Sequence, residues 1–330
     1  RGPGTPATPG APATPGMPGT PPDALPPADP GPIARAPEAG TQPANTLNPG
    51  LFGDLIGVSA RSTSTGFAQI PVLPRYAGLK VSDNDGPRPS DRFFFSFNHY
   101  SEVNQGFNAP GSPALELDRQ IIGFESLIGE DASWLVRLPF VQLSGSPAVE
   151  GSEIGDLTVG GKYAIVNDRF TGNVFSVGLN LTLPTGGRAD GIGALPSGAA
   201  APRAVFVQPW TGAAWNSGDT FYQGVSSLVL PTDPVYPTVW FNSFGVGYWL
   251  YRNPTDTLVR GIAPVAELHV NTPLTNRGDD ALILMKDQVN LTTGLYVQFP
   301  RLTVGGSVCV PLAGPLPYDV ETMLSVNYQF

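Results

Sequence analysis

The sequence predicts an all-β protein, a closed antiparallel transmembrane β-barrel of about twelve strands behind an extended Pro/Gly-rich N-terminal segment. Three observations predict it. Short segments with period-two alternation follow one another from Arg92 onward. The connections between them alternate between short and long. The polar face of these segments carries Ser, Thr, Asn, Gly and Gln in place of the Lys, Glu and Arg that water-facing sheets usually show.

Composition narrows the class of protein. Charged residues make up 14% of the chain, against roughly 25% in an average soluble domain. The net charge of −9 without a basic run argues against a nucleic-acid partner. One cysteine and two histidines exclude a disulfide framework and a Cys/His metal cluster, so we expect no metal and no cofactor. No stretch approaches the roughly 18 apolar residues of a membrane helix.

Three regions differ in composition. Residues 1–50 contain "GPGTPATPGAPATPGMPGTPP", whose regular prolines favour polyproline II, and we predict an extended periplasmic tether. We expect any signal peptide to have been removed before Arg1. Residues 51–91 are a transition with an apolar patch, "LFGDLIGV", that is a candidate plug element, and a turn cluster, "DNDGPRPSD", that leads into the first strand. Residues 92–330 form the predicted barrel.

The barrel strands are expected between dense Gly, Pro, Asn and Asp turns, with no convincing helix between any two of them. They are predicted at 92–100, 115–128, 133–142, 154–166, 173–184, 204–214, 219–230, 237–252, 258–270, 288–299, 302–312 and 318–330. Every second connection is tight, as in "GEDA" and "WNSG", and the interleaved set is mostly longer. Outer-membrane barrels have short periplasmic turns and longer external loops, which predicts both termini on the periplasmic side.

Charged residues within the strands fall mostly on the polar face. A Lys or Arg facing lipid at mid-depth costs roughly 2–4 kcal/mol, so we assign them to the lumen. The predicted lumen-lining residues are Arg92, Arg119, Glu125, Arg137, Asp156, Lys162 and Glu267. Two interpretations stay open: a mixed-charge constriction that orients a polar solute, or salt bridges that brace a narrow barrel or hold a plug.

Aromatic residues tend to fall near the predicted strand ends, where the two interfacial girdles of a membrane barrel would place them. Core packing is the alternative for any single ring. The residues concerned are Tyr100, Trp134, Phe140, Trp210, Trp240, Tyr248, Trp249, Tyr251, Phe299 and Tyr328.

The final stretch, "LSVNYQF", alternates Leu324, Val326, Tyr328 and Phe330 with polar residues. It resembles the C-terminal assembly signal of bacterial outer-membrane barrels. That resemblance implies the outer membrane of a Gram-negative bacterium, outer-membrane lipids as surroundings, and the barrel-assembly machinery as a partner during biogenesis.

Four further segments, "GDLTVGGKYAIV", "FSVGLNLTLPTG", "VFVQPWTGAAW" and "FYQGVSSLVLPT", resemble putative outer-membrane transporters annotated for the meta pathway of phenol degradation. The resemblance spans roughly residues 150–330. It implies a transport barrel, and the Pro-rich leader is not part of that family's pattern.

These observations give a leading function and two alternatives. The leading expectation is porin-like passive passage of small solutes, with no enzymatic activity. The alternative is a structural or anchoring barrel whose residues 1–50 bind a periplasmic or envelope partner. A minor alternative is an outer-membrane lipid hydrolase, because His99 and Ser101 lie two apart on one strand face, and outer-membrane phospholipases resemble this in using a His-x-Ser pair. Glu102 and Val103 depart from the Asn-Gly that continues their motif.

Overall fold

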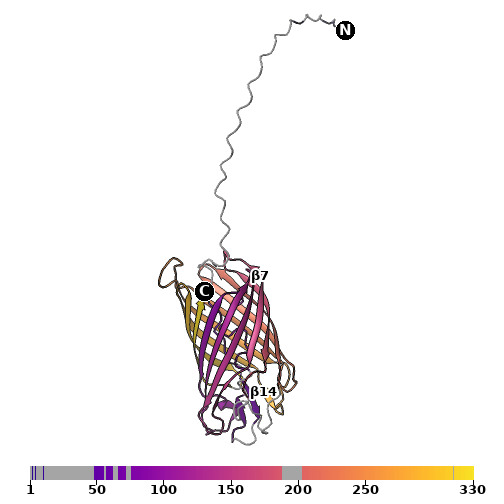
Figure 1. Cartoon of the computed structure of the whole chain (residues 1–330), viewed down its shortest axis with the longest axis vertical. Coiled ribbons are helices and arrows are strands. Elements are labelled where there is room, and N and C mark those ends of the chain that lie inside the picture. The colour runs from indigo at the N-terminus through magenta and orange to yellow at the C-terminus, as the bar shows by residue number, and fades with distance from the viewer. Residues whose placement is uncertain are drawn as a thin grey trace. The chain divides into compact units, whose positions relative to one another are not determined.

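Twelve antiparallel strands form a closed barrel in the part of the chain that the computed structural model describes, namely residues 2, 4, 10, 48–55, 57–61, 66–71, 76–187, 203–314 and 316–330 (Figure 1). The predicted all-β barrel and its strand number are therefore confirmed. Nearly all of the predicted tether, residues 1–50, lies outside the described residues. The barrel strands are β3 (Arg92–Tyr100), β4 (Glu116–Ile128), β5 (Ala132–Ser144), β7 (Leu157–Asn167), β8 (Val174–Leu183), β9 (Phe206–Ser217), β10 (Thr220–Pro231), β11 (Val239–Tyr248), β13 (Gly261–Pro273), β15 (Gln288–Gln298), β16 (Leu302–Ala313) and β17 (Glu321–Gln329).

The barrel closes because its first and last strands pair. β17 runs antiparallel to β3 from the Glu321–Tyr100 pair to the Gln329–Arg92 pair, and every other barrel strand pairs with its neighbours in sequence order. A closed ring leaves no open sheet edge, so the backbone groups of each strand are hydrogen-bonded within the sheet, as a bilayer demands. Among the described residues, no helix is both long and apolar enough to cross a membrane.

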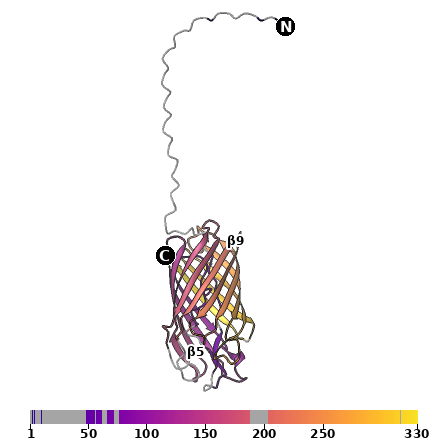
Figure 2. The same cartoon turned by 90° about the vertical axis from the view of Figure 1, so that its right-hand side faces the viewer.

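The two ends of the barrel differ, as the loop lengths predicted. The connections after β4, β7, β9 and β15 are tight, and Phe330 lies at the same end, which we call the short-turn end (Figures 1 and 2). The connection between β11 and β13 is longer than expected and holds a short strand, β12 (Tyr251–Arg252). The opposite, long-loop end carries β6 (Gly151–Ile154), a 3₁₀ turn, η1 (Gln105–Phe107), and β14 (Ile283–Met285).

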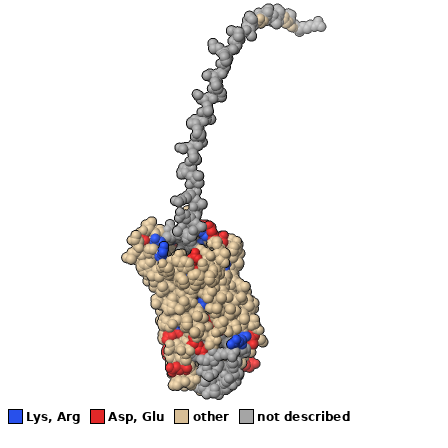
Figure 3. All heavy atoms as spheres, viewed as in Figure 1, with Lys and Arg blue, Asp and Glu red and all other residues tan. Residues whose placement is uncertain are grey.

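The outward face of the barrel is apolar. Phe175, Val177 and Leu179 of β8 are exposed, whereas Ser176 and Asn180, which alternate with them, are fully buried. Outward positions of the twelve strands carry charge only at Glu116 and Asp118, near the long-loop end of β4. On the face shown in Figure 3, charged residues gather toward the two ends and leave an almost uncharged band between them. Such a band suits a hydrocarbon environment.

The aromatic girdle prediction is wrong for three residues. Tyr100, Trp210 and Trp249 point into the barrel and are buried, whereas Trp134, Trp240, Tyr248, Tyr251 and Tyr328 are exposed. A side chain at Gly178 would meet the Trp210 indole at 2.3 Å, so the ring of β9 occupies space that a glycine on β8 leaves free. Position near a strand end therefore did not determine which way these rings point.

The barrel interior holds the described part of residues 48–91, which we call the inner segment. It starts at the short-turn end, where Gly50 O accepts a hydrogen bond from the Tyr296 hydroxyl (2.8 Å). At the long-loop end its strands β1 (Val58–Arg61) and β2 (Gln69–Pro71) join β14 in a three-stranded sheet. The segment then returns to Arg92, and the Leu51–Asp85 bridge joins its two limbs inside the barrel.

Candidate functional site: a charged lumen filled by the inner segment

All seven predicted lumen-lining residues are buried on the inner side of the barrel, with Arg92 the most exposed at 6%. Six of them belong to two separate walls of the barrel that contact the inner segment. Asp156 belongs to neither wall. It precedes β7 at the long-loop end, and its Oδ1 accepts a hydrogen bond from the Gly186 backbone N–H at 2.7 Å.

The first wall is cationic and consists of β3, β4, β5 and β7. Three cations converge on one carboxylate of the inner segment, Asp85. Its Oδ1 lies 2.5 Å from Arg92 Nη2 and 2.9 Å from Lys162 Nζ, and its Oδ2 lies 3.2 Å from Arg137 Nη2. Glu125 completes the cluster, 2.9 Å from Arg92 and 3.0 Å from Lys162. Every carboxylate oxygen of Asp85 thus faces a buried cation.

The inner segment makes further contacts with the same wall. Arg119 binds Asp83 through its two terminal nitrogens: Nη1 lies 2.7 Å from Asp83 Oδ2, and Nη2 donates to Oδ1 at 3.2 Å. Arg137 also donates to the Lys80 backbone oxygen (2.8 Å), and Arg92 donates to the Asn84 backbone oxygen (2.9 Å). Burial alone raises the pKa of Asp85, but Lys162, Arg92 and Arg137 outweigh it and lower that pKa below its ordinary value. Asp85 is therefore an anion in this structure.

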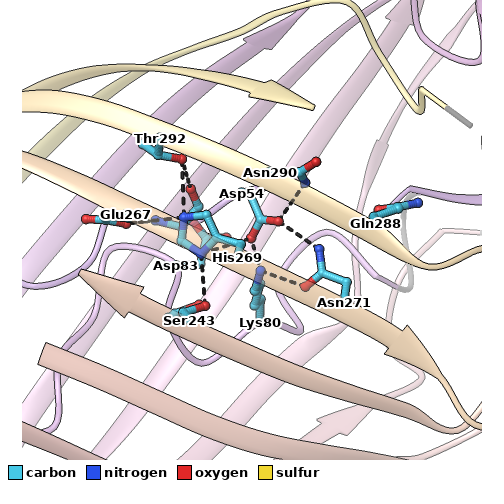
Figure 4. A network of polar contacts seen from close by, with 12 residues as sticks. Asp54, Lys80, Asp83, Ser243, Glu267, His269, Asn271, Gln288, Asn290 and Thr292 are labelled. Atoms are coloured by element: carbon cyan, nitrogen blue, oxygen red, sulfur yellow. Dashed lines mark hydrogen bonds and ion pairs between the residues drawn. The ribbon is translucent and has the colours of Figure 1, made fainter. Parts of the chain in front are cut away.

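The second wall consists of β11, β13 and β15 and is shown in Figure 4; β8, β9 and β10 separate it from the first wall on one side of the ring, and β16 and β17 on the other. Asp54 of the inner segment lies at the centre of the polar network on this wall. Asp54 forms a buried ion pair with Lys80, and its Oδ2 accepts hydrogen bonds from Asn271 and Asn290, both at 2.8 Å. Lys80 in turn donates to Asn271 (3.0 Å). Both limbs of the inner segment therefore meet on this wall.

His269 extends this network across the sheet. Its Nδ1 lies 2.9 Å from Ser243 Oγ, and its Nε2 lies 3.2 Å from Thr292 Oγ1. Ser243 Oγ is also 2.9 Å from Ser82 Oγ of the inner segment. The imidazole thus has a hydrogen-bond partner at each nitrogen and links the wall to the segment.

Glu267 of β13 binds the backbone of the inner segment at Phe52 and Gly53. The Phe52 N–H lies 2.9 Å from Glu267 Oε1 and 3.0 Å from Oε2, and the Gly53 N–H donates to Oε2 at 3.2 Å. The Phe52 ring stacks on Tyr296, with centroids 4.1 Å apart. A side chain at Gly294 would come within 2.5 Å of the Phe52 ring, so a wall glycine makes room for it.

The sequence predicts the charged barrel residues of this site but not their partners on the inner segment. The predicted turn before the first strand contains Asp83 and Asp85, and both are buried at 2% or less and bind wall cations. Asp54, Lys80 and Glu321 were not singled out, and Asn98 Nδ2 donates to Glu321 at 2.7 Å inside the barrel. The available signal was charge: "LFGD" and "DNDG" supply carboxylates in front of strands whose inward positions carry arginine and lysine.

The lumen is packed along the described residues. Glu125, Arg137, Asn180, His269, Asn290 and Glu321 are fully buried, although each faces the barrel axis. A cavity of about 60 Å³ opens at the short-turn end, lined among others by Gly50, Asp85, Arg92 and Asn327. That volume holds a few waters at most, so side chains and the inner segment fill most of the lumen at this level of the described structure.

The predicted hydrolytic pair does not assemble. His99 lies outside the barrel near the long-loop end, with Nδ1 2.8 Å from Asp118 Oδ1 and Nε2 3.5 Å from Glu116 Oε2. Ser101 Oγ instead donates to Val320 O at 3.3 Å. A base that takes a serine proton needs Nε2 at hydrogen-bond distance from that hydroxyl, and here Nε2 faces a carboxylate. Within the described residues, no group of three or more His, Cys, Asp or Glu side chains could hold a metal ion.

Comparison with solved structures agrees with this fold. An outer membrane channel from Pseudomonas putida F1 superposes with a TM-score of 0.54 at 14% identity, over 73% of this chain and 96% of the other. The KdgM porin gives a TM-score of 0.42 at 9% identity, over 72% of this chain and 99% of that chain. The β domain of the Bordetella autotransporter BrkA gives 0.44 at 13% identity, over 73% and 99%. The chain thus has the fold of an outer-membrane β-barrel.

No family model matches the chain, and no curated protein matches it in sequence. The resemblance to the transporters of the meta pathway of phenol degradation therefore stays a prediction.

Proposed function

We propose that this protein is an outer-membrane channel for passive passage of small polar solutes, closed in this structure by its inner segment. The observation that carries the proposal is the polarity of the wall beneath that segment. Arg119, Arg137, Lys162, Glu267 and His269 all come from barrel strands and face the axis. A wall of this composition holds water as soon as the segment leaves, whereas an apolar interior does not.

The closed state is compatible with opening because the segment is held by side-chain contacts at defined points. Its cohesion with the barrel depends on ion pairs at Asp83 and Asp85, on the hydrogen bonds that Asp54 accepts from the wall, and on the Phe52–Glu267 attachment. Ionic and hydrogen-bonded contacts can be exchanged for water with a modest net change in free energy. We propose that the short-turn end, where Phe330 and Gly50 lie, faces the periplasm, and that the three-stranded sheet of β1, β2 and β14 lies on the outer side.

Planar bilayer recording of the full chain tests this function. We expect brief openings of low conductance in the wild type and a much higher open fraction in a variant with Asp54→Asn and Asp85→Asn together. A silent wild type together with a silent double variant, both with heat-resistant folded migration on gels, would exclude the channel. The rate at which a small unlabelled sugar leaves liposomes that contain the protein measures solute passage independently.

A structural role is the second candidate, favoured by the density of contacts that fill the lumen. In that case residues 1–50 bind a periplasmic or envelope partner and the barrel only anchors them. Deleting residues 1–39 should then release a co-purifying partner and leave the barrel folded. If the deletion changes no interaction and the channel conducts, the anchoring role is set aside.

A further inference from the structure

We propose that Arg92, Arg137 and Lys162 form a binding site for a small organic carboxylate, which Asp85 occupies in the closed state. The effect of this site on opening rests on the proposed function. A solute that binds there displaces Asp85 and thereby favours withdrawal of the inner segment from the lumen. The binding site itself can be tested without any measurement of passage.

Charge balance shows what the wall lacks without the segment. The first wall carries four cations, Arg92, Arg119, Arg137 and Lys162. Two buried barrel carboxylates accompany them, Glu125 of β4 and Glu321 of the adjoining strand β17. Four minus two leaves an excess of two positive charges, and the segment supplies the two missing carboxylates at Asp83 and Asp85. Withdrawal of the segment therefore leaves a wall with net positive charge, and such a wall attracts anions from solution.

Geometry selects the kind of anion. Asp85 presents two oxygens, one shared by Arg92 and Lys162 and the other bound by Arg137. Arginine holds a planar two-oxygen acceptor at fixed angles, which favours a carboxylate. The Phe94 ring lies beneath two of these cations, 4.5 Å from Arg92 and 6.0 Å from Arg137, and holds both guanidinium groups against the wall.

An apolar patch lies next to the site and favours a carboxylate with an organic body. Leu51 and Val81 of the inner segment pack on Trp210 and Val225 of the barrel wall. Leu51 is also the bridge partner of Asp85. When the segment withdraws, Trp210 and Val225 lose their cover, so a solute that carries an apolar group beside its carboxylate replaces both parts of the segment.

The site has an approach from water. The cavity at the short-turn end is lined by Asp85 and Arg92 together with Gln223 and Asn327. A small anion that enters this cavity therefore meets the Asp85 cluster without crossing the rest of the lumen.

Chemical rescue tests the site. Asp85→Ala removes the carboxylate and leaves the three cations, so the variant should unfold at a lower temperature than wild type in detergent. Sodium acetate should restore much of that loss with saturation at millimolar concentration, while acetamide, and sodium chloride at equal ionic strength, should not. Asp279→Ala, which removes an exposed loop carboxylate, is the matched control and should not respond to acetate. An acetate shift that is absent, or equal in all three proteins, overturns the proposal.

A second measurement uses the wild type, so it tests the site even if the Asp85→Ala variant does not fold. Acetate and benzoate should speed limited proteolysis within residues 48–91 several-fold, since they compete with Asp85 for the wall, whereas acetamide and benzamide should leave the rate unchanged. Equal rates with acids and amides would reject the carboxylate site. Conductance does not enter either test, so a silent bilayer refutes the channel while rescue by acetate still supports the site.

Discussion

The backbone N–H of Phe52 is hydrogen-bonded to both carboxylate oxygens of Glu267, at 2.9 and 3.0 Å, across 215 positions of sequence. This contact joins the inner segment to β13 near the middle of the barrel. Because the Phe52 ring also stacks on Tyr296 of β15, one residue ties the segment to two adjacent strands. The closed state therefore includes identifiable polar attachments, and each can be weakened separately.

Glu267→Gln should raise the open fraction of the channel. The amide keeps the shape of the side chain, but its NH2 group cannot accept a hydrogen bond, so one of the two oxygens that bind the Phe52 and Gly53 N–H groups is lost. A buried donor left without an acceptor costs about 1–3 kcal/mol, and 1.4 kcal/mol corresponds to a factor of about ten in an equilibrium. We expect the open-to-closed ratio in planar bilayers to rise about tenfold.

The control for this variant is Glu116→Gln, the same change at a half-exposed site outside the barrel. It should leave the open-to-closed ratio as in wild type. Equal ratios in wild type and Glu267→Gln would show that this attachment does not hold the segment.

The Asp54–Lys80 pair should behave as a coupled buried unit. Asp54→Asn or Lys80→Met alone leaves one buried charge without its partner, which costs about 3–5 kcal/mol in other proteins. The double variant removes both charges and should recover part of the loss. Proteolytic release of the inner segment, measured for both single variants and the double variant, gives the coupling free energy.

The Lys286–Asp279 pair serves as the comparison, since Asp279 is 90% exposed. Solvent screens such pairs, so its single and double variants should release the segment at the wild-type rate. Strict additivity at Asp54 and Lys80 would contradict a direct interaction between them.

Much of the barrel could be predicted from the sequence, because lipid on one side and a polar lumen on the other impose a period of two. That rule predicts the inner side for Arg119, Arg137 and Lys162, and all three side chains are buried in the structure. It could not predict their partners. Asp83 and Asp85 belong to a Gly/Pro-rich stretch without periodicity, and they meet their cations only because the barrel closes around them. The position of Trp210 near a strand end likewise predicts a girdle residue, but its ring points inward, where Gly178 on the adjacent strand leaves room for it.

The outward face should reject charge in a depth-dependent way. Leu179 of β8 is 46% exposed on the apolar band, and Leu179→Arg should destabilise the barrel in lipid vesicles by roughly 2–4 kcal/mol. Leu250→Arg, in the connection at the short-turn end, is the matched control and should have little effect. Denaturant unfolding followed by tryptophan fluorescence measures both, and equal stability of the two variants would argue against lipid on this face.

Acidification should weaken the closed state through Asp85 only at low pH. The wall cations lower the pKa of Asp85 in the closed state. A group with a lowered pKa stabilises that state above its ordinary pKa, and the contribution disappears as the pH falls through the lowered value. The ordinary pKa of aspartate is about 3.9. The difference in the free energy of opening between wild type and Asp85→Asn, taken from the logarithm of the open-to-closed ratio, should therefore be constant from about pH 8 to 5 and shrink only below about pH 4.

Comparing wild type with Asp85→Asn also separates Asp85 from Asp83. Burial raises the pKa of Asp83 even though Arg119 opposes the shift, so Asp83 takes up a proton at higher pH than Asp85 does. Both proteins share that contribution, and it cancels in the difference. If the difference already shrinks between pH 7 and 5, Asp85 lacks the cationic surroundings that hold it ionised, and the three-cation cluster does not control the closed state.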